Sequence, residues 1–162
     1  MIPEIRVKPF AALVLALVIT VGCRTVPVTS VTPAPPVSTM VGAASPKGAV
    51  DMMLAAAKVQ DIQALAAVWG DERGMTRDRI DRTELETRSI DLICLLRHDA
   101  AQVGEPQQAS GGRYLVNVDL TQKGNAATTT FTLARTAAGR WLVHTFELIP
   151  LQNKGFCPRP EH

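Results

Sequence analysis

Residues 113–121 read RYLVNVDLT, and this stretch decides the fold class. Apolar side chains recur at every second position, at Tyr114, Val116, Val118 and Leu120, with polar residues between most of them. Successive side chains of a strand point to opposite faces, so this period predicts a strand with one buried and one solvated face. Strands of that kind are typical of antiparallel sheets that pack one face on a core.

Two more strands are predicted on the C-terminal side of this stretch. Residues 128–136 place Phe131 and Leu133 on one face and a row of threonines on the other. Residues 141–149 are largely apolar on both faces, which predicts a strand covered on both sides. Glycine-containing turns separate the strands, at 110–112, 124–125 and 138–139.

A weaker strand is predicted on the N-terminal side, at residues 101–108. Pro106 has no N–H to donate, so this segment is expected at the edge of the sheet or at a bulge. The four segments together predict a four-stranded antiparallel meander. The mixed charges of residues 70–82 predict a solvated loop before it.

Helices are predicted ahead of the sheet. Ser45 caps the first helix and Pro46 takes its first position, where a missing N–H costs nothing. Asp61 caps a second, short helix, and the third begins at Asp81 or Thr83. Helices followed by hairpin-connected strands predict an α+β fold, in which two or three N-terminal helices pack on a curved antiparallel four-stranded sheet.

Residues 1–22 have the layout of an export signal. Their uncharged run, Phe10 to Val21, is shorter than the roughly 20 apolar residues of a membrane-spanning helix. The run ends in ITVGC at Cys23, which resembles the lipobox of bacterial lipoproteins. This resemblance implies cleavage before Cys23 and acylation of that cysteine. Thr20 departs from the pattern, where the family usually has leucine, and the alternative is an ordinary secreted protein.

Residues 23–45 are expected to be the lipidated cysteine and a disordered tether rich in Pro, Ser, Thr and Val. Fully extended at ~3.1 Å per residue, the tether would reach about 70 Å. Arg24 follows the cysteine, whereas Asp at that position typically signals inner-membrane retention in lipoproteins of two-membrane bacteria. The resemblance therefore implies an exported protein anchored to the outer membrane and facing the periplasm. Residues 46–162 are expected to form a single α+β domain.

The composition excludes a nucleic-acid partner. The chain has 17 Lys and Arg against 15 Asp and Glu, a net charge of +2 that falls to +1 once the two basic and one acidic residues of the signal are removed. No basic patch and no aromatic stacking platform accompanies this near-neutral balance. The membrane is thus expected as a partner only through the lipid anchor.

The order of three helices and a four-strand meander resembles the nuclear-transport-factor-2-like (cystatin-like) superfamily. The resemblance is carried by residues 49–69 with DIQAL at 61–65, by residues 70–74, by residues 92–98 and by GRWLV at 139–143. It points to an uncharacterised lipoprotein branch. It implies a cone-shaped sheet that holds a small apolar ligand. Enzymes of the superfamily place a carboxylate beside a Tyr or His in that cone.

The candidate pocket residues on this interpretation are Tyr114, Val116, Val118, Phe131 and His144. No carboxylate is clearly placed with them, and the sequence shows no nucleophile triad, phosphate loop or zinc spacing, so no catalytic residue, metal or cofactor is predicted. The expected function is a non-enzymatic envelope lipoprotein that binds a protein or a small apolar ligand. The alternative is a cone enzyme, isomerase-like or dehydratase-like, acting on a small hydrophobic substrate.

Two cysteines remain in addition to Cys23. Export places Cys94 and Cys157 in an oxidising compartment, where thiols tend to pair, so we expect a disulfide that pins the C-terminal tail against the third helix. The competing interpretation is a buried thiol at Cys94 and an exposed free thiol at Cys157.

Overall fold

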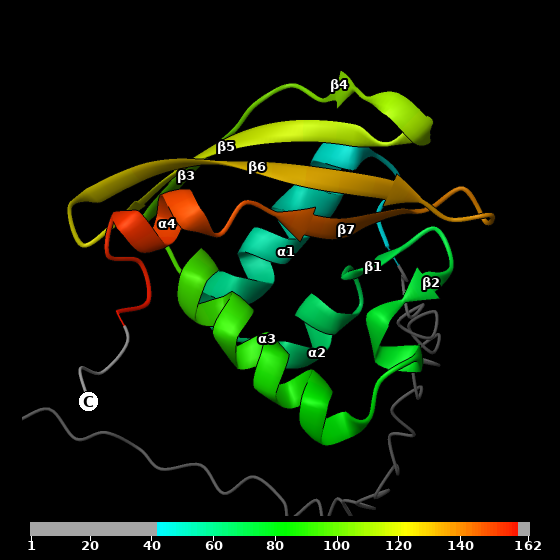
Figure 1. Ribbon diagram of the computed structural model, residues 1–162, viewed down its shortest axis with the longest axis horizontal. Helices are drawn as coiled ribbons and strands as arrows, with labels where there is room; N and C mark the ends of the chain where they lie inside the picture. Colours follow the sequence, from blue (N-terminus) through cyan, green and yellow to red (C-terminus); the bar gives the residue numbers. More distant parts are fainter. Residues whose placement is uncertain (1–41, 159–162) are drawn as a thin grey trace, which may run out of the picture. The chain divides into compact units, whose positions relative to one another are not determined.

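The computed structural model describes residues 42–158, so the signal, Cys23 and most of the tether lie outside the described residues. Helices and an antiparallel sheet make up this part of the chain, as the sequence predicts for an α+β fold (Figure 1). The helices are α1 (Pro46–Val59), α2 (Ile62–Ala66), α3 (Arg82–Leu96) and α4 (Ile149–Asn153). The strands are β1 (Gly70–Asp71), β2 (Gly74–Met75), β3 (Ala100–Val103), β4 (Gln107–Gln108), β5 (Tyr114–Gln122), β6 (Asn125–Arg135) and β7 (Trp141–Phe146).

The predicted caps begin the three N-terminal helices. The Ser45 hydroxyl accepts from the Gly48 N–H at 3.1 Å, and Asp61 Oδ1 accepts from the Ala64 N–H at 2.9 Å. The N-cap of α3 is Asp81 and not Thr83, because Asp81 Oδ1 accepts from the Glu84 N–H at 3.0 Å. Each carboxylate or hydroxyl satisfies a backbone donor that has no partner within its helix.

The main sheet has five strands rather than the expected four. Its order is β3-β5-β6-β7, and β4 pairs separately with the start of β5. The extra strand arises because residues 104–106 interrupt the predicted 101–108 strand between β3 and β4. Pro106 has no N–H to donate to a ladder.

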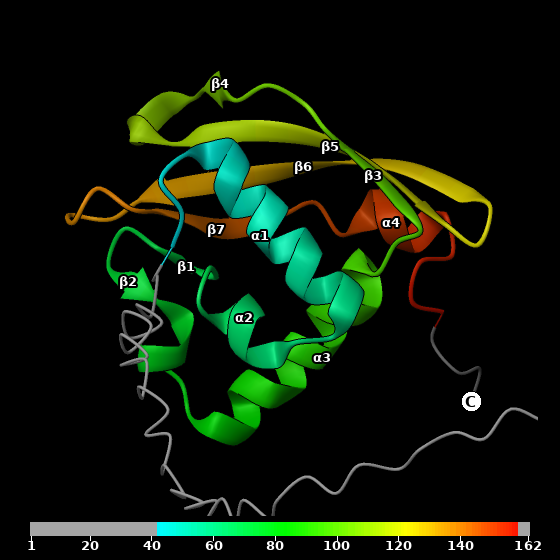
Figure 2. The ribbon, with the colours of Figure 1, turned by 180° about the vertical axis from the view of Figure 1, so that it is seen from behind.

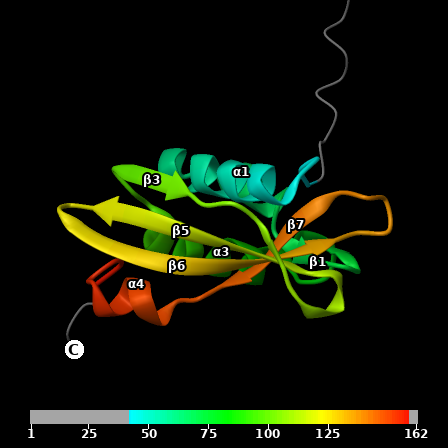
Figure 3. The same ribbon diagram turned by 90° about the horizontal axis from the view of Figure 1, so that it is seen from above.

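The three N-terminal helices lie on one face of this curved sheet (Figures 1 and 2). The curvature follows the two long strands, β5 and β6 (Figure 3). Apolar residues of α1 meet the inner face of the sheet, where Val116, Val118, Phe131, Leu133 and Val143 are fully buried. The Phe131 and Phe146 rings stack with centroids 5.1 Å apart. Burial of such side chains, about 1.5–3 kcal/mol each, is the main term that holds the helices to the sheet.

Two segments differ from their predictions. Residues 70–82 are not only a loop, because β1 and β2 pair as a short hairpin and a 3₁₀ turn follows at Thr76–Asp78. The last strand ends at Phe146 rather than at Ile149, which begins α4. Pro150 explains the second difference, since it has no N–H for a strand ladder but is accepted in the first turn of a helix.

The predicted disulfide is present between Cys94 of α3 and Cys157. Their Cα atoms are 5.1 Å apart, within the range that a disulfide requires. Phe156 is also buried, and its N–H donates to the Leu151 carbonyl at 3.0 Å. The C-terminal segment is therefore held both by a covalent bond and by an aromatic side chain in the core.

Candidate functional site

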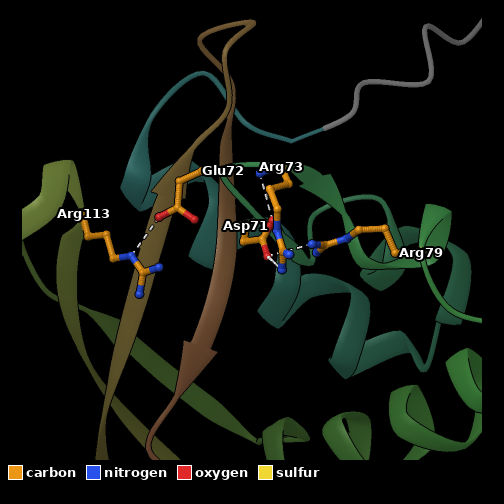
Figure 4. Close-up of polar contacts among 5 residues, drawn as sticks. All are labelled: Asp71, Glu72, Arg73, Arg79 and Arg113. Atoms are coloured by element: carbon orange, nitrogen blue, oxygen red, sulfur yellow. Dashed lines mark hydrogen bonds and ion pairs between the residues drawn. The ribbon is translucent and has the colours of Figure 1, made fainter.

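A buried carboxylate organises the β1–β2 hairpin. Asp71 is 6% exposed, and its Oδ1 accepts from the Arg73 backbone N–H at 2.9 Å. Its Oδ2 accepts from Arg73 Nη2 at 2.9 Å and from Arg79 Nη1 at 2.8 Å (Figure 4). The 3₁₀ turn brings Arg79 back toward the hairpin. One carboxylate is thus shared by two guanidinium groups.

These contacts set the protonation state of Asp71. Burial raises its pKa, but hydrogen bonds from Arg73 and Arg79 lower it by more, so the pKa lies well below its ordinary value of 3.8. Asp71 is therefore ionised at every physiological pH.

A second ion pair fastens the hairpin to the main sheet. Arg113, which precedes β5, donates from Nε to Glu72 Oε1 at 2.8 Å (Figure 4). That hydrogen bond lowers the pKa of Glu72. Gly70 allows the hairpin to approach β7, because a Cβ there would lie 2.8 Å from Leu142 Cδ1.

A β-bulge places His144 beside the hairpin. Thr132 pairs with Thr145 and Leu133 pairs with Val143, so His144 is an extra residue without a partner on β6. Bulges re-aim side chains and recur next to functional sites. The free edge of β7 is covered here, because the Val143 N–H donates to the Val68 carbonyl at 2.9 Å.

Two adjoining hollows share Trp69 and His144. The first, of about 390 Å³, is called the polar hollow because its lining includes the charged residues Asp71, Arg73, Arg79 and Arg88. The rest of its lining is Gly70, Thr76 and Ile80. The apolar hollow, of about 150 Å³, is lined by Trp69, His144 and the mostly apolar set Met53, Leu92, Val143, Thr145, Phe146 and Leu148. Trp69 and His144 thus line both a hollow that carries charged side chains and an apolar one.

The structure distributes the predicted pocket residues over three places. Val116, Val118 and Phe131 are fully buried in the core. The half-buried Tyr114 ring packs edge-on against Trp141, with centroids 5.0 Å apart. His144 alone lines the two hollows described above.

Sequence reasoning missed Arg73 and Arg79 as site residues. Both fall in the segment that was expected to be a solvated loop, where alternating charges are usually exposed. The available signal was the position of Asp71 directly after an apolar helix and Gly70, which favours burial of its carboxylate. A buried carboxylate needs a cationic partner, and three arginines follow within eight residues, of which Arg73 and Arg79 pair with Asp71.

Two further observations bear on the class of this protein. Among residues 42–158, no three His, Cys, Asp or Glu side chains gather as a metal site, and no helix has the length and apolar content needed to cross a membrane. The fold defines an α+β domain with helices on one face of a curved antiparallel sheet. The sequence matches no protein-family model and no curated protein.

Proposed function

We propose that this chain is an exported lipoprotein of the bacterial envelope whose folded domain binds a small ligand without transforming it. The anchor is the predicted acylated Cys23, in the outer membrane and facing the periplasm, and residues 24–41 belong to the tether. The last residues of the predicted tether, 42–45, instead pack on the domain, where Ala43 is buried and pairs with Trp141 of β7. In this proposal the curved sheet and its helices are a cone of the nuclear-transport-factor-2-like type. The order of helices and strands supports that assignment.

The observation that carries the binding role is the pair of hollows that meet at Trp69 and His144. Ligand sites combine a concave, mostly apolar wall with a few polar groups that fix orientation. The apolar hollow supplies the first feature, and the arginines and His144 supply the second. We therefore propose this double hollow, rather than the core around Val116 and Val118, as the ligand site.

A binding role fits the hollow better than the alternative, an isomerase or dehydratase. The cone enzymes of that superfamily place a carboxylate in the site, and a carboxylate needs a raised pKa to abstract a proton near neutral pH. Asp71 is the carboxylate that lines the polar hollow, and its pKa is held far below that range by Arg73 and Arg79. This carboxylate serves as a fixed counter-charge and is a poor general base.

The anchoring part predicts an all-or-none result. Mass spectrometry of the mature protein should show acylated Cys23 at the amino terminus, because signal cleavage and lipidation are coupled at a lipobox. Replacing Cys23 with Ser should release the protein from the membrane fraction, because the substitution removes the acylated residue that anchors it. A cleaved protein with an unmodified Cys23 would contradict the lipoprotein proposal.

The binding part predicts that filling the apolar hollow abolishes uptake of an uncharged amphiphile. Leu148 lines this hollow and is 41% exposed, so Leu148→Trp adds bulk with little strain on the core. We expect octanol titration, followed by amide NMR, to shift resonances at Trp69 and His144 in the wild type. The variant should bind octanol at least tenfold more weakly, about 1.4 kcal/mol.

The matched control is Ile149→Trp, at a neighbouring residue that is 68% exposed and does not line the apolar hollow. This variant should bind octanol like the wild type. Equal loss of octanol binding in both variants, or a wild-type protein that binds no amphiphile, neutral or charged, would count against the double hollow as a ligand site.

A further inference from the structure

We propose that the ligand of the double hollow is a small amphiphilic anion. Its carboxylate, phosphate or sulfate head contacts Arg73 and Arg79, and its short alkyl tail passes Trp69 and His144 into the apolar hollow. This inference rests on the proposed binding function and names its ligand class.

The charge of the polar hollow favours an anion. Its lining carries three guanidinium groups, from Arg73, Arg79 and Arg88, against the one carboxylate of Asp71. Arg88 also pairs with Glu84 one turn earlier on α3. Asp71, by contrast, pairs with both Arg73 and Arg79, so these three side chains together keep a net charge of +1. An anionic head would neutralise this excess.

Hydrogen bonds to Asp71 hold Arg73 and Arg79 in place before an anionic head group binds. Asp71 binds one nitrogen of each side chain, Nη2 of Arg73 and Nη1 of Arg79, and a guanidinium carries five N–H donors in a fixed fork. This fork matches the two oxygens of a carboxylate or the edge of a phosphate. Because Asp71 is buried and fastened to the hairpin backbone, it fixes the arginines before any ligand arrives, which lowers the ordering cost of binding.

The burial of Arg79 adds strength to its contact. Its side chain is 32% exposed, against 78% for Arg73. A charge that is partly shielded from water attracts a counter-ion more strongly than one in bulk solvent. Arg79 should therefore be the main anchor of the head, and Arg73 should close over it from the solvent side.

The small volume of the apolar hollow limits the size of the alkyl tail that it can hold. Its volume of about 150 Å³ is below the roughly 300–1,000 Å³ of sites that enclose drug-sized ligands. A short linear chain matches this volume better than a fused ring system does. Met53, Leu92 and Leu148 present flexible aliphatic side chains, which adapt to a chain of methylenes. Trp69 and His144 mark the border that the chain would cross.

The test compares ligands that differ only in head or tail, on the full mature protein. Calorimetric titration with octanoate should give at least tenfold tighter binding than with octanol, because a hydrogen-bonded charge pair forms. Acetate, which has the head without the tail, should bind at least tenfold more weakly than octanoate. Equal affinity for octanoate and octanol would overturn the inference while leaving the proposed binding function intact. Binding of neither would reject both.

Variants that each replace one arginine with glutamine test which arginines bind the head group. Arg79→Gln should reduce octanoate affinity to the level of octanol and leave octanol binding unchanged. Arg73→Gln, at a more exposed residue, should lower octanoate affinity severalfold and gives a second test if the first variant folds poorly. Arg82→Gln removes the same charge from a residue of α3 that pairs with Glu86 and does not line the polar hollow, so it is the control. Equal octanoate affinity in all three variants would overturn the assignment.

Discussion

Replacing Cys94 and Cys157 together with alanine is expected to lower the free energy of unfolding by about 4 kcal/mol. The two cysteines are separated by 63 residues along the chain, and closing a loop of that size removes about this much conformational free energy from the unfolded state. For a domain of this size the loss corresponds to a fall in Tm of about 15 °C. Thermal and urea unfolding of the mature protein measure both quantities.

The same disulfide provides its own control. A reducing agent should destabilise the wild-type protein by a similar amount and leave the double-alanine variant unchanged. Phe156 and Leu151 are buried and continue to hold the C-terminal segment after reduction, so the folded state should persist at 25 °C. A wild-type protein whose unfolding midpoint does not respond to reductant would contradict a stabilising role for this bond.

The parts of the fold that could be predicted are those in which local chemistry decides. Ser45, Asp61 and Asp81 each have a short polar side chain ahead of an apolar helical pattern, and each caps its helix. The alternation of residues 113–121 is preserved in β5, where Val116 and Val118 face the core. In these cases the residue and its immediate neighbours contain the information.

The candidate site depends instead on pairings between distant segments. The His144 bulge exists only relative to β6, because the register changes between Thr132 and Leu133. The β1–β2 hairpin has two residues in each strand, too few to show a period, and Arg113 reaches it from 41 residues away. Strict alternation along β7 would place His144 on the same face as Leu142 and Phe146. A single extra residue in the strand changes that relation.

The hairpin cluster leads to a second large effect on stability. Replacing Asp71 with Asn should lower the free energy of unfolding by about 2 kcal/mol at pH 7, because the charge-assisted bonds to Arg73 and Arg79 are lost. The cost stays below that of a fully buried ion pair, since the Arg73 side chain is 78% exposed and water solvates its charge. Urea unfolding at pH 7 measures this difference.

The dependence on pH distinguishes the charge of Asp71 from its shape. Its folded-state pKa is lowered from 3.8, so below that pH the unfolded chain binds a proton that the folded protein does not. The contribution of Asp71 to stability is therefore fully present well above pH 3.8 and declines as the pH falls through 3.8 toward the folded-state pKa.

The measurement compares the free energy of unfolding of the wild type and of Asp71→Asn as a function of pH. Glu72, whose pKa is also lowered by Arg113, is present in both proteins, so the difference in their free energies of unfolding isolates the contribution of Asp71. The wild-type protein should lose its advantage over Asp71→Asn progressively between about pH 5 and pH 1, whereas Asp51→Asn, at an exposed residue of α1, should follow the wild type throughout. A constant advantage across that range would mean that Asp71 stabilises the hairpin by its shape and not by its charge.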